Sequence, residues 1–151
     1  MLPLFRTYIL VNNSGQTLSF SGGGRIIIRE TAWKLTAGVL DPTVLTEDDL
    51  GFTTGTLTDG SEIIGDVQLD NSSDLYWGSQ VQIEIKHDAG TAADGTFDLY
   101  MAEGNVTGEL SSDADGYADA ESSDLYNVGS LTWQSDGQNG ETMRSQAFAI
   151  E

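Results

Sequence analysis

The chain has 151 residues, 38% of them hydrophobic, with a formal net charge of −18 at pH 7 and no cysteine. A chain of this length is expected to form one domain that buries roughly two-thirds of its unfolded surface, and without cysteine it has no disulfide, no thiolate nucleophile and no thiolate metal ligand. The acidity argues against nucleic acid and anionic membrane as partners, because phosphate groups would be repelled over most of the surface.

The beginning of the chain does not have the pattern of a targeting segment. Residues 1–8 show no basic region ahead of an apolar run and no small-residue cleavage site, both of which a secretory signal needs. No stretch approaches the roughly 20 apolar residues that span a bilayer. We therefore expect a protein that is made in a cytoplasm and has no membrane partner.

Charge is divided unevenly along the chain. Residues 1–40 carry four cations against one acid, a net charge of +3, whereas the remaining residues carry two cations against 23 acids, a net charge of −21. Such asymmetry is typical of a segment that docks on something acidic, carried by a body that repels other anions. The sequence predicts an N-terminal arm or edge strands over residues 1–24 and a β-sandwich domain over residues 25–151.

In chain order, eight segments have strand character, and turns rich in Gly, Asp and Asn separate them. The run Ile26–Ile28 is continuously apolar, which is typical of a strand buried on both faces. Residues 42–50 are the best helix candidate, with Asp41 as a possible N-cap, or else form an irregular loop. The strand candidates are residues 6–11, 16–20, 24–33, 62–69, 79–86, 96–102, 126–134 and 143–150.

Two of these segments, residues 79–86 and 96–102, alternate with a period of two residues, as half-buried strands do. We expect these two strands to neighbour one another. Their inward positions are Val81, Ile83 and Ile85 in the first strand, and Phe97, Leu99 and Met101 in the second.

About eight strands with little helix predict an all-β fold. The favoured architecture is a β-sandwich, and a single jelly roll of about eight antiparallel strands is its commonest eight-stranded version. The first residues of the chain would add an N-terminal arm to this body.

One pentapeptide, Ser-Ser-Asp-Leu-Tyr, occurs twice, at residues 72–76 and 122–126. Turn chemistry explains both copies, since Asp forms Asx turns and the following Leu and Tyr can pack on a sandwich edge. The alternative is a recognition feature, in which Tyr76, Trp77 and Tyr126 lie on one exposed aromatic rim.

The densest acidic stretch offers a weak calcium candidate in Asp113, Asp115 and Asp119, because calcium takes six to eight oxygen ligands from such loops. The EF-hand register fails, since Ser111 and Ser122 would occupy its first and last positions. A solvated loop is the favoured interpretation. Zinc is disfavoured because His87 is the single histidine and there is no cysteine, so we expect no cofactor.

Catalysis has no recognisable motif here. With 24 acids a pair of glycosidase carboxylates cannot be picked out, because their separation in space is what defines them. Three tryptophans and five tyrosines leave open a carbohydrate-binding module, for which Trp77 is the best exposed platform. We expect that the protein is not an enzyme.

The chain resembles the head decoration (cement) proteins of tailed bacteriophages that have a jelly-roll body. The resemblance covers the central two-thirds of the chain, and depends on its acidic cysteine-free sandwich pattern, the strands at residues 76–85 and 95–100, and the basic N-terminal stretch. It implies a non-catalytic homotrimer on the outer surface of the virion capsid, with the major capsid protein as partner. A tail, baseplate or fibre component of such a virus is the alternative.

The resemblance implies that the protein docks on the capsid through its N-terminal residues. Cations there would meet acidic patches on the shell, and the apolar residues would supply strand addition or burial. The predicted docking residues are Arg6, Tyr8, Ile9, Leu10, Arg25, Arg29 and Lys34.

Overall fold

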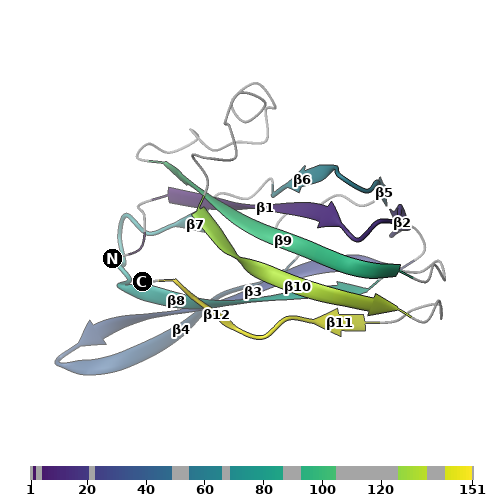
Figure 1. The fold of residues 1–151 in the computed structure, drawn as a ribbon. Helices are drawn as coiled ribbons and strands as arrows, with labels where there is room; N and C mark the ends of the chain where they lie inside the picture. The colour runs from purple at the N-terminus through teal and green to yellow at the C-terminus, as the bar shows by residue number, and fades with distance from the viewer. Residues whose placement is uncertain are drawn as a thin grey trace.

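Two antiparallel sheets packed face to face make up the fold (Figure 1). The computed structural model describes residues 2, 5–20, 23–48, 55–65, 69–86, 93–104, 126–135 and 142–150. Every regular element in these ranges is a strand. The predicted all-β, sandwich-like fold is confirmed, and the jelly-roll connectivity stays a prediction.

The first sheet has the strand order β10-β9-β1-β6, and β7 also pairs with β1. Its strands are β1 (Phe5–Asn13), β6 (Glu62–Ile64), β7 (Leu69–Asp70), β9 (Ala93–Gly104) and β10 (Tyr126–Ser135). The second sheet has the order β11-β8-β3-β4, and β12 also pairs with β8. Its strands are β3 (Arg25–Thr36), β4 (Val39–Asp48), β8 (Gly78–Lys86), β11 (Thr142–Arg144) and β12 (Phe148–Ile150). A separate pair is formed by β2 (Leu18–Ser19) and β5 (Thr56–Leu57).

The core lies between the two sheets, and the predicted inward side chains of β8 and β9 fill it. All six are essentially inaccessible to solvent, as period-two alternation predicts. The expectation that these two strands neighbour one another is wrong, because β8 pairs with β3 while β9 pairs with β1 and β10. Alternation identifies the buried face of a strand but not the strand beside it.

Strand β1 lies inside the first sheet and does not form an arm. It pairs with β9 along its whole length, and with β6 and β7 on its other edge. Tyr8, Ile9 and Leu10 are buried. The predicted arm is therefore wrong over the span of β1, because this backbone is hydrogen-bonded on both edges and these side chains pack inside the domain.

Strands β3 and β4 form a long hairpin whose tip extends beyond the sandwich (Figure 1). Its turn consists of Ala37 and Gly38, which have φ values of 52° and 81°. Positive φ at both central residues is the requirement of a type I′ turn, whose twist matches that of the strands. The predicted helix over residues 42–50 is thus wrong: residues 42–48 belong to β4, where pairing with β3 overrides local propensity.

The apolar run Ile26–Ile28 is buried on both faces of β3, as predicted. Ile26 and Ile28 point into the core, and Ile27 lies on the opposite face between Arg25 and Arg29. Among the residues that the structure describes, no helix has the length and apolar character of a membrane span.

Candidate functional site

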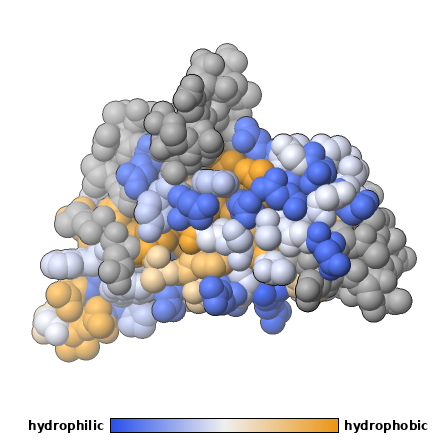
Figure 2. Space-filling model, in the orientation of Figure 1, coloured by the Kyte–Doolittle hydropathy of each residue, from blue (hydrophilic) through white to orange (hydrophobic). Residues whose placement is uncertain are grey.

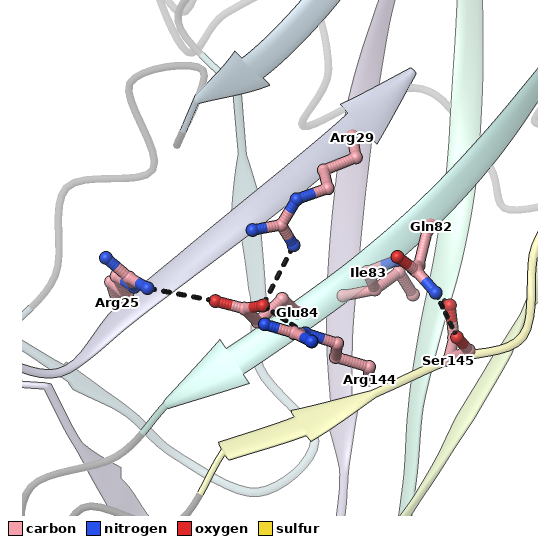
Figure 3. A network of polar contacts seen from close by, with 7 residues as sticks. All are labelled: Arg25, Arg29, Gln82, Ile83, Glu84, Arg144 and Ser145. Carbon is pink, nitrogen blue, oxygen red and sulfur yellow. Dashed lines mark hydrogen bonds and ion pairs between the residues drawn. The ribbon is translucent and has the colours of Figure 1, made fainter. Parts of the chain in front are cut away.

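A buried carboxylate joins three arginines on the outer face of the second sheet, the face turned away from the core (Figure 3). The Oε1 atom of Glu84 accepts a hydrogen bond from Arg25 Nη2 at 3.1 Å, and its Oε2 accepts one from Arg29 Nη1 at 2.9 Å. Arg144 on β11 donates to the same Oε2 through its Nε. Glu84 is fully buried, whereas the side chains of Arg25 and Arg144 are more than half exposed. We call these four residues the arginine cluster.

The arginines keep the Glu84 carboxylate ionised. Burial acts to raise the pKa of Glu84, but hydrogen bonds from Arg144 and Arg29 and the charges of both guanidinium groups outweigh it. The pKa falls from an ordinary 4.5 to about 2. The cluster therefore keeps its full set of charges throughout the neutral and mildly acidic range.

This lowered pKa predicts a specific acid sensitivity. The ion pairs stabilise the fold fully above the unfolded-state pKa of 4.5 and cease to do so as the pH falls toward the folded-state pKa of about 2. Relative to Glu84→Gln, the wild type should lose about 1–3 kcal/mol more unfolding free energy between pH 5 and pH 2, after allowing for solvent screening of the exposed arginines. Urea unfolding across this pH range measures the difference. Equal losses in both proteins would show that the arginines do not stabilise the carboxylate.

The four cations of the first 40 residues are all paired with carboxylates of the same chain. Arg6 donates to Glu30 at 2.9 Å, and neither side chain is exposed to solvent. Lys34 donates to Asp74 Oδ1 at 2.8 Å on the surface, and this hydrogen bond raises the pKa of Lys34. Arg25 and Arg29 bind Glu84.

Docking through Arg6, Tyr8, Ile9 and Leu10 is consequently not possible in this fold, because all four are buried. The charge of Arg6 is used inside the domain and is not available to a partner. Arg25, Arg29 and Lys34 keep partial exposure, and the first two lie in the arginine cluster.

Exposed apolar side chains gather on the β3–β4 hairpin. Four of these side chains are between 50% and 67% exposed, and we call them the hairpin patch: Leu35, Val39, Leu40 and Val44. Figure 2 shows hydrophobic surface at the projecting end of this hairpin. Contiguous exposed apolar surface on a soluble protein is typical of an interaction site, whereas single exposed residues are not.

The hairpin patch and the arginine cluster both include residues of β3. Arg25 and Arg29 alternate with inward-pointing residues of β3, and Leu35 has the same parity as the arginines. Leu40 is paired with Leu35, so it shares that face. From Arg29 to Leu35 the strand advances roughly 20 Å. Val44 is paired with Thr31 and shares it too, whereas Val39 is paired with Thr36 and lies on the other side of the hairpin. The outer side of the second sheet is thus cationic at one end and, through Leu35, Leu40 and Val44, apolar at the other, and we call it the docking face.

The free edge of β4 is protected from strand addition by Pro42. The Trp33 carbonyl accepts a hydrogen bond from the Trp77 amide at 3.0 Å, so Trp33 directs its backbone polar groups away from β4. Pro42, its partner on β4, consequently turns its nitrogen to the open edge, where proline has no hydrogen to donate. Such a proline blunts edge-to-edge pairing. The side chains of the hairpin, and not its backbone edge, are what a partner would contact.

Gly78 is required where Trp33 crosses the beginning of β8. A Cβ at this position would lie 2.9 Å from Trp33 Cζ2 and 2.8 Å from the Ile150 carbonyl oxygen. Gly78→Ala should therefore lower the unfolding free energy by about 1–3 kcal/mol through overpacking, and should change the tryptophan fluorescence. Urea unfolding followed by fluorescence checks this. Gly55→Ala is the matched control, since a Cβ there meets no atom of the described residues within 4 Å. An equal effect of both substitutions would contradict the packing.

The aromatic residues predicted to form one rim come from elements of both sheets and differ in exposure. Trp77 is 56% exposed and precedes β8 of the second sheet, whereas Tyr126, also exposed, begins β10 of the first sheet. Tyr76 is buried, so the rim prediction is wrong for it. Asn71 holds it there by accepting the Tyr76 amide hydrogen at 2.7 Å.

Several sequence candidates lie outside the described residues. These are His87, the calcium candidates Asp113, Asp115 and Asp119, and residues 122–125 of the second pentapeptide. Within the described ranges, no group of three or more His, Cys, Asp or Glu side chains is arranged to hold a metal ion.

No protein-family model matches this chain, and neither a curated protein nor a solved structure matches it. Function is therefore inferred from the docking face. Arg144 and three residues of the hairpin patch, Leu35, Leu40 and Val44, are part of it, and the sequence did not predict them.

Proposed function

We propose that this chain is a structural protein of a tailed-bacteriophage particle, a decoration (cement) protein that binds the outside of the assembled head and bridges major capsid subunits. The observation that carries the proposal is the exposed apolar patch on a hairpin that projects from an otherwise acidic domain. Such a patch gains free energy when a partner covers it. The role needs no catalytic residue, because a protein that binds only the assembled lattice stabilises it by linkage.

The size of the patch favours several copies acting together. Burying the half-exposed Leu and Val side chains is worth on the order of 1 kcal/mol each, and association costs of several kcal/mol oppose that gain. One hairpin alone would therefore bind weakly. A homotrimer presenting three docking faces would raise the avidity without any new contact. Sedimentation equilibrium tests the trimer.

Co-sedimentation with purified heads tests the proposal itself. The protein should pellet with expanded heads of the virus that encodes it and should raise the temperature at which these heads break open. Purified tails from the same virus are the second arm. Binding to tails and not to heads would replace the decoration role by that of a tail, baseplate or fibre component, and binding to neither particle would refute a virion role.

Exposure of Trp77 favours one further candidate, a carbohydrate-binding module. A flat indole ring more than half exposed can stack on the apolar face of a sugar. Tyr76 does not extend this platform, because it is buried. Glycan binding that Trp77→Ala abolishes, without effect on binding to heads, would support this candidate.

A further inference from the structure

We propose that the arginine cluster is a receptor for carboxylate side chains on an acidic surface of the partner protein. This inference rests on the proposed function only for the existence of a protein partner. Its basis is the excess of positive charge that one buried carboxylate holds in a fixed arrangement on the docking face (Figure 3).

The cluster is built so that the cations stay oriented. Two oxygens of Glu84 receive three guanidinium groups, which come from β3 on one side and β11 on the other. Flexible surface arginines lose side-chain entropy when they bind an anion, and anchoring them in advance lowers that cost. Glu84 is thus a positioning residue for the arginines.

Donors remain available on the two exposed arginines. Arg25 uses Nη2 and Arg144 uses Nε toward Glu84. Their remaining N–H groups make no hydrogen bond to any residue within the described ranges. A guanidinium group that keeps two neighbouring donors free can bind a carboxylate through both of its oxygens.

The arginine cluster is a positively charged site on a strongly negative protein. Lys86 is paired with Arg25 across the strands, which brings four of the six cations of the chain to this face. Within the described residues, the acid whose side chain lies among these cations is Glu84. Three arginines and one carboxylate give the arginine cluster itself a net charge of +2, against −18 for the whole chain.

Carboxylates of a protein suit the arginine cluster better than the phosphates of a nucleic acid do. Arg25 and Arg29 are four residues apart on β3, a span of roughly 13 Å. A nucleic acid backbone would extend past this patch onto the acidic remainder of the chain and be repelled there. An acidic loop of a protein can place one or two carboxylates on the arginine cluster and its apolar residues on the hairpin patch.

A fluorescent decapeptide of glutamate is the direct probe, with affinity measured by anisotropy at low and at physiological salt. The variant Arg25→Gln/Arg144→Gln should bind at least tenfold more weakly than the wild type and with a smaller salt dependence. Lys34→Gln is the matched control, because it removes an exposed cation whose partner is Asp74. Its affinity should stay within about twofold, in keeping with the small contribution of exposed ion pairs.

Glu84→Gln separates positioning from net charge. This substitution makes the arginine cluster more positive by one charge. Simple charge attraction therefore predicts tighter binding of the glutamate peptide, whereas loss of positioning predicts binding weaker by about threefold or more. Tighter binding by Glu84→Gln would overturn the inference, and so would a loss of affinity in Lys34→Gln equal to that of the double arginine variant. Better competition by inorganic phosphate or duplex DNA than by glutamate would overturn it as well. Shell binding unchanged in Arg25→Gln/Arg144→Gln would overturn it and leave the proposed function standing. Peptide binding without shell binding would instead refute the proposed function alone.

Discussion

Replacing either member of the Arg6–Glu30 ion pair should destabilise the fold by about 3–5 kcal/mol, because the remaining charge would be buried without compensation. Both side chains are inaccessible to solvent, and the bond joins β1 of the first sheet to β3 of the second. Urea unfolding of Arg6→Met and of Glu30→Met, each compared with wild type, measures this loss. Lys34→Met is the control, and breaking this exposed pair should cost less than about 1 kcal/mol.

The double variant Arg6→Met/Glu30→Met should recover most of that stability. Four polar side-chain atoms around this ion pair are buried without a hydrogen-bond partner in the described part of the chain. They are Arg6 Nη1, Glu30 Oε2, the Tyr8 hydroxyl and Ser79 Oγ. Burial and the nearby Glu30 charge also raise the pKa of Tyr8 well above its ordinary 10.0. An ion pair left partly unsatisfied gains little net free energy, and apolar residues of similar volume often replace one without loss. A double variant as unstable as the single variants would contradict this account.

Placing charges on the hairpin patch should weaken shell binding by at least about 100-fold while leaving the fold intact. In Leu35→Asp/Leu40→Asp, two unpaired carboxylates would be buried at the interface, and each carries a large desolvation cost. The two leucines face each other across the hairpin and are at least half exposed, so the free domain tolerates the change. Quantitative co-sedimentation gives the affinities, and circular dichroism with urea unfolding shows that the fold is retained.

Two further variants make this result interpretable. Leu35→Thr/Leu40→Thr keeps β-propensity while removing apolar area, and its affinity should fall between those of the wild type and the aspartate variant. Tyr126→Asp adds a charge at an exposed aromatic residue of the first sheet and should bind as the wild type does. If Tyr126→Asp abolished binding and the leucine variants did not, the docking face would have been assigned to the wrong sheet.

The buried side of each long strand could be read from the sequence. Val81, Ile83 and Ile85 alternate with polar residues and are all buried, and Ile26–Ile28 is covered on both faces as expected. These predictions succeed because burial depends on a local period of two residues. The pairing of the strands depends on residues far apart in the chain, so alternation alone does not reveal that β8 and β9 lie in different sheets.

The roles of the cations could not be read in the same way. Arg6 is 24 residues from Glu30, and Arg29 and Arg144 are 55 and 60 residues from Glu84. Nothing in the local sequence distinguishes a paired cation from one that a partner could use. The charge asymmetry of the first 40 residues therefore has a mainly internal explanation, and the part that a partner could contact is Arg25, which lies beside Arg144 and is more than half exposed.

The exposed hairpin was missed for a related reason. Leu35, Leu40 and Val44 have the residue types of a buried strand face, and only the extension of β3 and β4 beyond the sandwich exposes them. Asp41 as a possible N-cap and Pro42 at the first helical position imitate the start of a helix. Pairing with β3 decides the outcome in favour of a strand.

Hydrogen–deuterium exchange on the head-bound protein tests the docking face most directly. The comparison is between the bound protein and the free protein in the same oligomeric state, with amide exchange followed by mass spectrometry. We expect binding to slow exchange in residues 31–46 of the β3–β4 hairpin and in residues 142–145 around Arg144, and to leave residues 126–132 of β10 unchanged. Slowed exchange confined to β9 and β10 of the first sheet, with the hairpin unchanged, would contradict the assignment of the docking face.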